Sequence, residues 1–291
     1  MNKKITNQNE AYQEEIVIGL TPAPNHFPRI ARLVRSVVDH TSLPCRFCFL
    51  VANPELLPRL PLGLQVEVRE LRPSDRELLE SWYLAEQRDD IPSLVYSKLL
   101  LPEYFPHHQK ILYMEVDEIV QGDLSDLWQK FLPASFSLAA ARSRNKKRTF
   151  AAPETFRRAF PEGRYFNPGV LLINTSWWNS SNAKAICDRE SRKQKEANGR
   201  YYDFYDQGLL NHGFQDCIKE FSFKFNTTGL GHLSNLSESE LNRACVLHWN
   251  GPRKPWQPEG LYREYYYYNL SKRQFCTMRF FEKLTKRFKR N

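Results

Sequence analysis

Several features that would assign this chain of 291 residues to a class of protein are missing from it. No apolar run approaches the roughly 18–20 residues that span a bilayer, which excludes a transmembrane helix. The basic start of the chain is not followed by an apolar segment, so we expect no signal peptide. We therefore predict a cytoplasmic protein, with a Golgi or endoplasmic reticulum lumen only if an N-terminal anchor has been removed.

The chain also has few closely spaced cysteines and no sequence typical of a flexible linker. Only Cys45 and Cys48 among the six cysteines are closely spaced, and no second pair lies at zinc-finger spacing. The pair leads into an apolar segment that predicts a buried strand, so we favour reduced thiols over a redox or metal pair. Because glycine- and serine-rich linkers and internal repeats are absent as well, we expect a single domain.

The composition permits a sizeable core, with 41% hydrophobic and 13% aromatic residues. Short apolar runs alternate with helical patterns, which is typical of an α/β fold. We expect strands at 15–20, 47–51, 64–68, 111–114, 135–141 and 170–174, and helices at 29–38, 93–101, 175–196 and 205–213.

Two carboxylates follow the predicted strand at 111–114. Glu115 and Asp117 are two residues apart, and extended backbone of period two would project both to the same side. The carboxyl end of a strand is where open α/β sheets bind ligands. Adjacent carboxylates repel each other unless a cation relieves them, and oxygen ligands suit Mg²⁺ or Mn²⁺. The alternative is a solvated acidic turn.

A second polar cluster lies near the end of the chain. His248 could bind a metal, Lys254 could neutralise a phosphate, and Gly251 would allow a phosphate to approach the backbone closely. A single histidine beside a tryptophan is more often structural. Together with Glu115 and Asp117, however, this cluster makes a site for a metal and a diphosphate plausible.

Four segments, in this order, resemble glycosyltransferase family 8, the retaining enzymes of the glycogenin and bacterial lipopolysaccharide galactosyltransferase group. Residues 113–124 are similar to the family's strand with Asp-x-Asp, and residues 166–174 to its Phe-Asn-x-Gly-Val-x-x-x-Asn strand. Residues 206–211 resemble its Asp-Gln-Asp-x-x-Asn helix start. Residues 248–256 match its His-x-x-Gly-x-x-Lys-Pro-Trp motif in full.

The resemblance implies a GT-A fold, in which a central, mostly parallel mixed sheet with flanking helices binds a UDP-sugar and usually Mn²⁺, with Mg²⁺ as the other candidate. It also implies roles for individual residues. The metal ligands would be Glu115, Asp117 and His248; the donor-binding residues Thr21, Lys98, Glu115, Asn167, Gly251 and Lys254; and the catalytic residues Asp206 and Gln207.

The chain departs from the family pattern at five positions. Glu115 replaces an Asp, Lys98 stands where an Arg is usual, and Gly208 replaces the second Asp of Asp-Gln-Asp. The first strand ends at Thr21 without the common uracil-side Asp. Arg142 lies where a sugar-contacting Asp is expected.

The function implied is a retaining transfer of a hexose, glucose or galactose, from a UDP-sugar to a glycan or lipid-linked acceptor. A neutral amide such as Gln207 is a poor nucleophile, so a front-side route is favoured over a covalent intermediate. The alternative is a catalytically impaired relative that acts as a sugar-nucleotide or glycan-binding module.

Basic residues gather in two places. The loop at 142–148 is either a solvated surface or the binding site of an anionic acceptor. Residues 271–291 contain eight Lys or Arg and one Glu, so most of the formal net charge of +9 lies there. This amphipathic tail suits an anionic membrane surface or packing on the domain. Because no nucleic-acid module is recognised, we expect no nucleic-acid partner. We thus divide the chain into an extension (1–14), a catalytic domain (15–270) and a tail (271–291).

Overall fold

A computed structural model describes residues 14–83, 93–144, 158, 160, 164–196, 205–232 and 236–267. Within these ranges a seven-stranded sheet has the order β3-β2-β1-β4-β7-β6-β8. Its strands are β1 (Ile16–Leu20), β2 (Cys45–Val51), β3 (Gln65–Glu70), β4 (Lys110–Tyr113), β6 (Leu138–Arg142), β7 (Phe166–Asn174) and β8 (Ile218–Phe221). All neighbours are parallel except β7, which is antiparallel to both β4 and β6. The predicted α/β fold with a mixed, mostly parallel sheet is confirmed.

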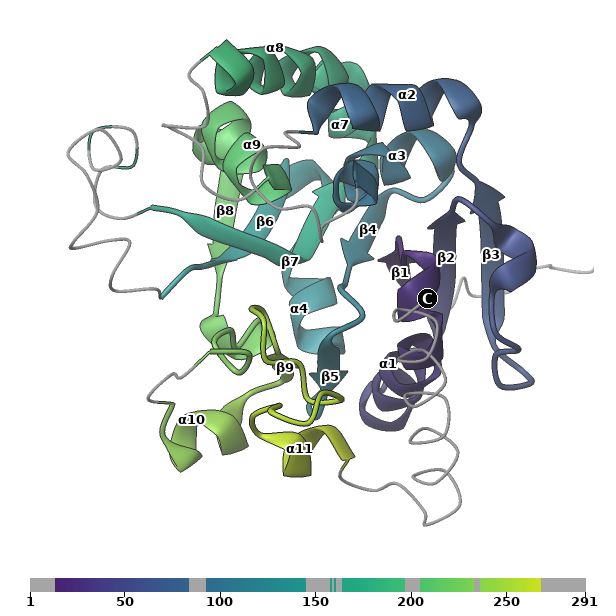
Figure 1. Ribbon diagram of the computed structural model, residues 1–291, viewed down its shortest axis with the longest axis vertical. Coiled ribbons are helices and arrows are strands. Elements are labelled where there is room, and N and C mark those ends of the chain that lie inside the picture. The colour runs from purple at the N-terminus through teal and green to yellow at the C-terminus, as the bar shows by residue number, and fades with distance from the viewer. Residues whose placement is uncertain are drawn as a thin grey trace, which may run out of the picture.

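Helices flank this sheet (Figure 1). They are α1 (Phe27–His40), α2 (Pro73–Trp82), α3 (Leu101–Tyr104), α4 (Ser125–Lys130), α7 (Thr175–Ser180), α8 (Ala183–Glu196), α9 (Tyr205–Phe214), α10 (Glu238–Arg243) and α11 (Arg263–Tyr267). Short 3₁₀ helices are η1 (Pro24–His26), η2 (Pro54–Leu56), η3 (Ser93–Leu100), η4 (Pro133–Ser135), η6 (Gln215–Cys217) and η7 (Phe223–Phe225). In Figure 1, α2, α3, α7, α8 and α9 gather at the top of the view.

Burial explains the central strands. Every residue of β1 and of β7 is buried, as expected for apolar strands covered on both faces. In α1 the residues Ile30, Leu33, Val34 and Val37 follow helical spacing and are fully buried. The middle of the sheet and α1 therefore support the segments that follow β1 and β4 and the start of β7.

Three elements differ in detail from the sequence prediction. The helix expected at 93–101 is a 3₁₀ helix as far as Leu100. The helix expected at 175–196 is divided into α7 and α8, because Asn182 has a φ of 56°, a left-handed conformation that interrupts helical bonding. Strand β7 begins at Phe166 rather than at 170, so Asn167 lies within the sheet.

A second, two-stranded sheet joins distant parts of the chain. Strand β5 (Glu118–Val120) pairs antiparallel with β9 (Val246–His248), with Glu118 opposite His248. Both strands lie together near the bottom of Figure 1. This pairing places the residues just before β5 beside the residues just after β9, which are the two polar clusters of the sequence.

None of the helices in the described ranges is long and apolar enough to cross a membrane. The predicted extension (apart from Glu14) and the predicted basic tail lie outside the described residues.

Candidate active site

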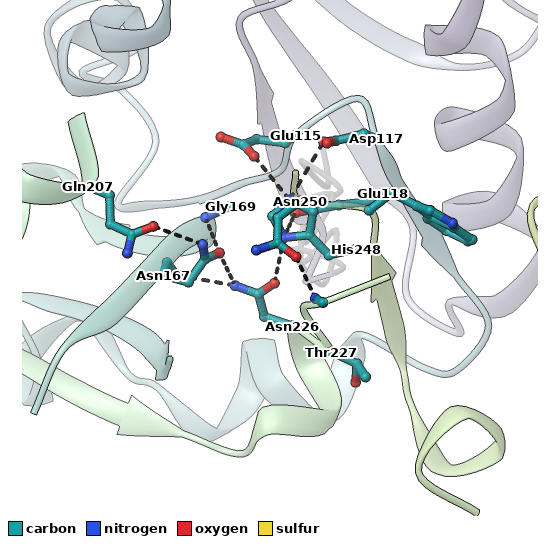
Figure 2. Close-up of polar contacts among 12 residues, drawn as sticks. Glu115, Asp117, Glu118, Asn167, Gly169, Gln207, Asn226, Thr227, His248 and Asn250 are labelled. Carbon is teal, nitrogen blue, oxygen red and sulfur yellow. Dashed lines mark hydrogen bonds and ion pairs between the residues drawn. The ribbon is translucent and has the colours of Figure 1, made fainter. Parts of the chain in front are cut away.

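Glu115 and Asp117 lie in the turn that joins β4 to β5. Their carboxylates face the same imidazole: His248 Nε2 is 3.2 Å from Glu115 Oε2 and 3.7 Å from Asp117 Oδ1 (Figure 2). The two carboxylates thus converge as predicted, but the local reason differs. Residues 116 and 117 form a turn rather than extended strand, so period-two alternation is not what directs them.

The arrangement fits a divalent cation. His248 Nδ1 lies 2.9 Å from Asn226 Oδ1, which can only accept, so Nδ1 carries a proton, and in the neutral ring the Nε2 lone pair faces the carboxylates. An imidazole lone pair and two carboxylates repel one another unless a cation lies between them. Because His248 is only 1% exposed, solvent cannot relieve this repulsion. One nitrogen and two oxygens are ligands that Mn²⁺ accepts.

A further acid, Glu118, lies behind His248. Its Oε1 is 3.5 Å from His248 Nδ1, and its side chain is fully buried. Burial, together with the charges of Glu115 and Asp117, raises the pKa of Glu118 well above its usual range. The carboxyl group of Glu118 therefore favours its protonated form more than a free glutamate does.

A fully buried lysine connects Glu115 with the start of α9. Lys98 Nζ, from η3, is 2.7 Å from Glu115 Oε1 and 2.7 Å from Asp206 Oδ2 at the start of α9. Burial alone would lower the pKa of Lys98, but Asp206 and Glu115 outweigh it and raise the pKa well above the usual value. Burial would likewise raise the pKa of Glu115, yet the ammonium of Lys98 holds that pKa well below its usual range.

A chain of side-chain amides continues from His248 toward α9 (Figure 2). Asn226 Nδ2 donates to Asn167 Oδ1 at 2.9 Å, and Asn167 Nδ2 donates to Gln207 Oε1 at 3.0 Å. Burial raises the pKa of the neighbouring Asp206 above its usual value. Seven of the residues predicted for the site thus lie in one connected network: Lys98, Glu115, Asp117, Asn167, Asp206, Gln207 and His248.

The Lys254 ammonium lies beside Asp117. It forms an ion pair with Asp117 Oδ2 and donates to the Trp249 carbonyl at 2.8 Å. An ammonium has three protons, so one remains for a ligand. Gly251, in the same loop, has a φ of 109°, and a Cβ there would lie 2.4 Å from His232 Nε2. Only glycine is compatible with this turn.

Thr21 directly follows β1. It forms a side-chain hydrogen bond with Tyr113, whose ring lies 4.6 Å from Lys98 Nζ. Thr21 is therefore linked to the network through Tyr113 and Lys98.

The described part of the basic loop is neutralised by acids. Arg142 Nη2 is 2.8 Å from Glu220 Oε2, and Arg144 Nη1 is 3.1 Å from Glu240 Oε1. Arg144 also lies 4.0 Å from the Phe223 ring centroid. Residues 145–148 lie outside the described residues.

The sequence reasoning missed three residues that lie in or near this network. Glu118 and Asn226 contact His248, and His26, just before α1, interacts electrostatically with Asp117 and Lys254. Burial lowers the pKa of His26 to about 4. The signal for His26 was its position in the loop after β1, since such loops line ligand sites in α/β sheets. Asn226 follows η7 and gave no comparable signal.

Comparison with known proteins identifies the family of this chain. The model for glycosyl transferase family 8 matches residues 17–260. The chain belongs to glycosyltransferase family 8.

Curated relatives are distant in sequence. Glycosyltransferase 8 domain-containing protein 2 of Mus musculus is 24% identical over 282 residues, which cover 85% of this chain and 79% of the relative. Glycosyltransferase GlyD of Streptococcus pneumoniae serotype 4 is 28% identical over 249 residues, covering 80% and 27%. Probable galacturonosyltransferase 5 of Arabidopsis thaliana is 24% identical over 255 residues, covering 80% and 39%.

Solved structures share the fold. Galactosyltransferase LgtC, in complex with donor and acceptor sugar analogues, superposes with a TM-score of 0.70 at 20% identity, covering 90% of this chain and 99% of that chain. Glycosyltransferase GlyE of Streptococcus pneumoniae TIGR4 gives a TM-score of 0.63 at 20% identity, covering 93% and 64%. The GT-A-like fold predicted from the motifs is confirmed.

Proposed function

We propose that this chain is a retaining hexosyltransferase that moves glucose or galactose from a UDP-sugar to a glycan or lipid-linked acceptor, with Mn²⁺ as its cofactor. The observation that carries the proposal is the convergence of Glu115 and Asp117 on His248 Nε2, at 3.2 and 3.7 Å. Glu115, Asp117 and His248 would hold the ion, and Mg²⁺ could replace it. Bound Mn²⁺ would offset the negative charge of the UDP leaving group.

Lys254 is the residue suited to the leaving group. Its ammonium already uses two protons, on Asp117 and on the Trp249 carbonyl, which fixes its position. The third proton can be donated to a diphosphate oxygen on which negative charge grows as the sugar departs. Gly251, in the same turn, would allow the diphosphate to approach the backbone. Thr21 and Lys98 would complete the donor side.

Asp206 and Gln207 are suited to the sugar. The carboxylate of Asp206 is held by Lys98, and the Gln207 carbonyl accepts a hydrogen bond from the Asn167 amide, so both side chains have a set orientation. A neutral amide is a poor nucleophile, and Gln207 therefore favours attack by the acceptor on the same face as the departing UDP. That route keeps the anomeric configuration.

The basic loop and the basic tail indicate the charge of the acceptor and the surface at which the protein acts. We propose an anionic glycan or glycolipid as acceptor at the basic loop, and a basic tail (271–291) that contacts an anionic membrane surface beside a catalytic domain (15–270). Such a protein would work in the cytoplasm or on a membrane facing it. Arg142 and Arg144 pair with acids, and the other cations of the loop, Lys146, Lys147 and Arg148, lie outside the described residues.

UDP release from UDP-glucose and UDP-galactose tests the reaction. We expect Mn²⁺-dependent release by the wild-type protein and none by His248→Ala. The matched control is His108→Ala, which removes an imidazole bound to Glu67, outside the site, at 3.0 Å. The anomeric configuration of the product, read by proton NMR, tests retention. If no metal-dependent UDP release occurs with either donor, the proposal is wrong.

The second candidate is a binding module without turnover. The departure at Glu115 favours it, because this carboxylate is shared between Lys98 and His248. A UDP-sugar that raises the melting temperature with Mn²⁺, without UDP release, would favour this function over transfer.

A further inference from the structure

Asn226 connects the proposed metal ligand with the proposed sugar pocket. It follows η7 and is fully buried, between His248 and Asn167 (Figure 2). Its Oδ1 lies 2.9 Å from His248 Nδ1, and its Nδ2 lies 2.9 Å from Asn167 Oδ1 and 3.2 Å from the Asn167 carbonyl. One side chain therefore contacts both halves of the site.

The partners on Asn167 determine which way the Asn226 amide faces. The backbone carbonyl of Asn167 can only accept, so the Asn226 atom beside it must be the amide nitrogen. Oδ1 is then the atom that faces His248, and it can only accept a hydrogen bond from Nδ1–H. This contact selects one neutral tautomer of His248, the one whose Nε2 lone pair faces Glu115 and Asp117.

The side-chain amide of Asn167 is likewise oriented by its partners. Asn167 Oδ1 accepts from Asn226 Nδ2 at 2.9 Å and from the Gly169 backbone N–H at 3.1 Å. Its amide nitrogen is therefore left to donate to Gln207 Oε1 at 3.0 Å. The donors along His248, Asn226, Asn167 and Gln207 thus all point one way, and Asn226 is the member that joins the two ends.

Packing confines the ring on which Asn226 acts. A Cβ at Gly169 would lie 2.2 Å from His248 Cε1, so the backbone of β7 lies directly against the imidazole. Translation of the ring is restricted, and the remaining freedom is the choice of tautomer and ring flip. A hydrogen-bond acceptor at Nδ1 is the device that decides this choice.

We propose that Asn226 is a positioning residue that selects the metal-binding tautomer of His248 and orients Asn167 toward Gln207. It is not one of the proposed metal or donor ligands and contacts His248 and Asn167, so it would act through these neighbours. This inference rests on the proposed function for its consequences in catalysis, whereas the tautomer itself is a property of the metal-free protein.

Two substitutions separate the two halves of this role. Asn226→Ala removes both contacts. Asn226→Asp retains an oxygen acceptor for His248 Nδ1–H but places a second oxygen against the two acceptors of Asn167, so only the His248 contact survives. The matched control is Asn174→Ala, a buried amide outside the site that donates to the Phe136 carbonyl at 2.8 Å and accepts from the Trp177 N–H at 3.0 Å.

The first measurement is the His248 tautomer in the full-length, metal-free protein, by proton–nitrogen NMR of the ring, with His248→Ala used to assign the signal. The second is the Kd for Mn²⁺ alone, by electron paramagnetic resonance of the free ion. We expect the Nδ1–H tautomer in the wild type, Asn226→Asp and Asn174→Ala, and its loss in Asn226→Ala, with Mn²⁺ bound about 10- to 100-fold more weakly. Asn226→Asp should bind Mn²⁺ as the wild type does but lose kcat.

An unchanged tautomer with an unchanged Mn²⁺ Kd in Asn226→Ala would overturn the proposal. Should Asn226→Ala fail to fold, Asn226→Asp still decides, because loss of the Nδ1–H tautomer in that variant also contradicts the role. If the wild type releases no UDP while the tautomer responds as expected, the proposed transfer fails and the positioning role stands.

Discussion

Lys98 Nζ lies 2.7 Å from Glu115 Oε1, so two of the departures from the family pattern contact each other. Glutamate carries its carboxylate one methylene further from the backbone than aspartate does. Lysine carries a single ammonium in place of the fork of arginine. The longer acid compensates for the altered base: Glu115 reaches Lys98 with one oxygen and faces His248 Nε2 with the other, at 3.2 Å. The two replacements are therefore parts of one exchange.

The exchange predicts strong coupling between Lys98 and Glu115. In Glu115→Asp the carboxylate retracts by about 1.5 Å, one carbon–carbon bond, and loses Lys98 or His248. We expect kcat/KM for UDP release to fall about 10-fold or more, and Lys98→Arg in the same chain to restore part of the loss. The coupling energy should be about 1–2 kcal/mol in a double-mutant cycle. Simply additive losses in the double variant would contradict the exchange.

Lys98 should also dominate the stability of the site. Lys98→Met leaves the carboxylates of Glu115 and Asp206 without their shared cation in a buried position, which should cost about 3–5 kcal/mol of unfolding free energy. Urea denaturation measures it. The matched control is Lys110→Met, because Lys110 is also buried but donates only to the carbonyls of Trp128 and Phe131, at 2.6 and 3.0 Å.

We expect the control to cost less, about 1–3 kcal/mol, since no charge is left unpaired there. Equal losses for the two lysine variants would mean that the ion pairs at Lys98 contribute nothing beyond hydrogen bonding.

Much of the fold could be predicted because the relevant signals are local. The apolar runs of β1 and β7 and the helical spacing in α1 are properties of adjacent residues, and they predicted those elements to within a few residues. The division between α7 and α8 was not predicted, because helical spacing continues across it, although Asn182 is of a residue type that adopts the left-handed conformation more readily than most.

The candidate site was predictable only where a motif marks it. His248, Glu115 and Asp117 were identified by residue type and spacing, but their meeting depends on the pairing of β5 with β9, which joins segments more than a hundred residues apart. Asn226 and Glu118 acquire their importance from that same tertiary contact. In the sequence they are an ordinary amide after an aromatic segment and an ordinary acid at the start of a strand.

Gly169 should be intolerant of any side chain. The Cβ of Gly169→Ala would lie 2.2 Å from His248 Cε1 and 2.7 Å from its Nδ1, so the imidazole must move. We expect a stability loss of about 1–3 kcal/mol from overpacking, with much weaker Mn²⁺ binding and loss of UDP release. Electron paramagnetic resonance and urea denaturation measure the two effects.

The control for Gly169→Ala is Gly213→Ala in α9, where the added Cβ would approach Ile186 Cγ2 at 3.0 Å, outside the site. It should alter stability but not the Kd for Mn²⁺. Wild-type Mn²⁺ binding by Gly169→Ala would show that contact with β7 does not position His248.

Acid should weaken the protein partly through Asp123, whose carboxylate accepts from the Ser125 N–H at 2.8 Å and the Ser42 N–H at 3.2 Å. Burial would raise the pKa of Asp123, but hydrogen bonds from the side chains and the backbone N–H groups of Ser42 and Ser125 outweigh it and lower the pKa from 3.8 to about 2. The unfolded chain therefore binds a proton between pH 4 and 2 that the folded chain does not, and the contribution of Asp123 is lost as the pH falls through that range.

Asp123→Asn retains an accepting oxygen but cannot titrate. We expect the difference in unfolding free energy between wild type and Asp123→Asn to shrink by about 1 kcal/mol from pH 5 to pH 2, after allowance for solvent screening. Urea denaturation across this range measures it, and a difference that stays constant would show that the charge of Asp123 adds nothing to its hydrogen bonds.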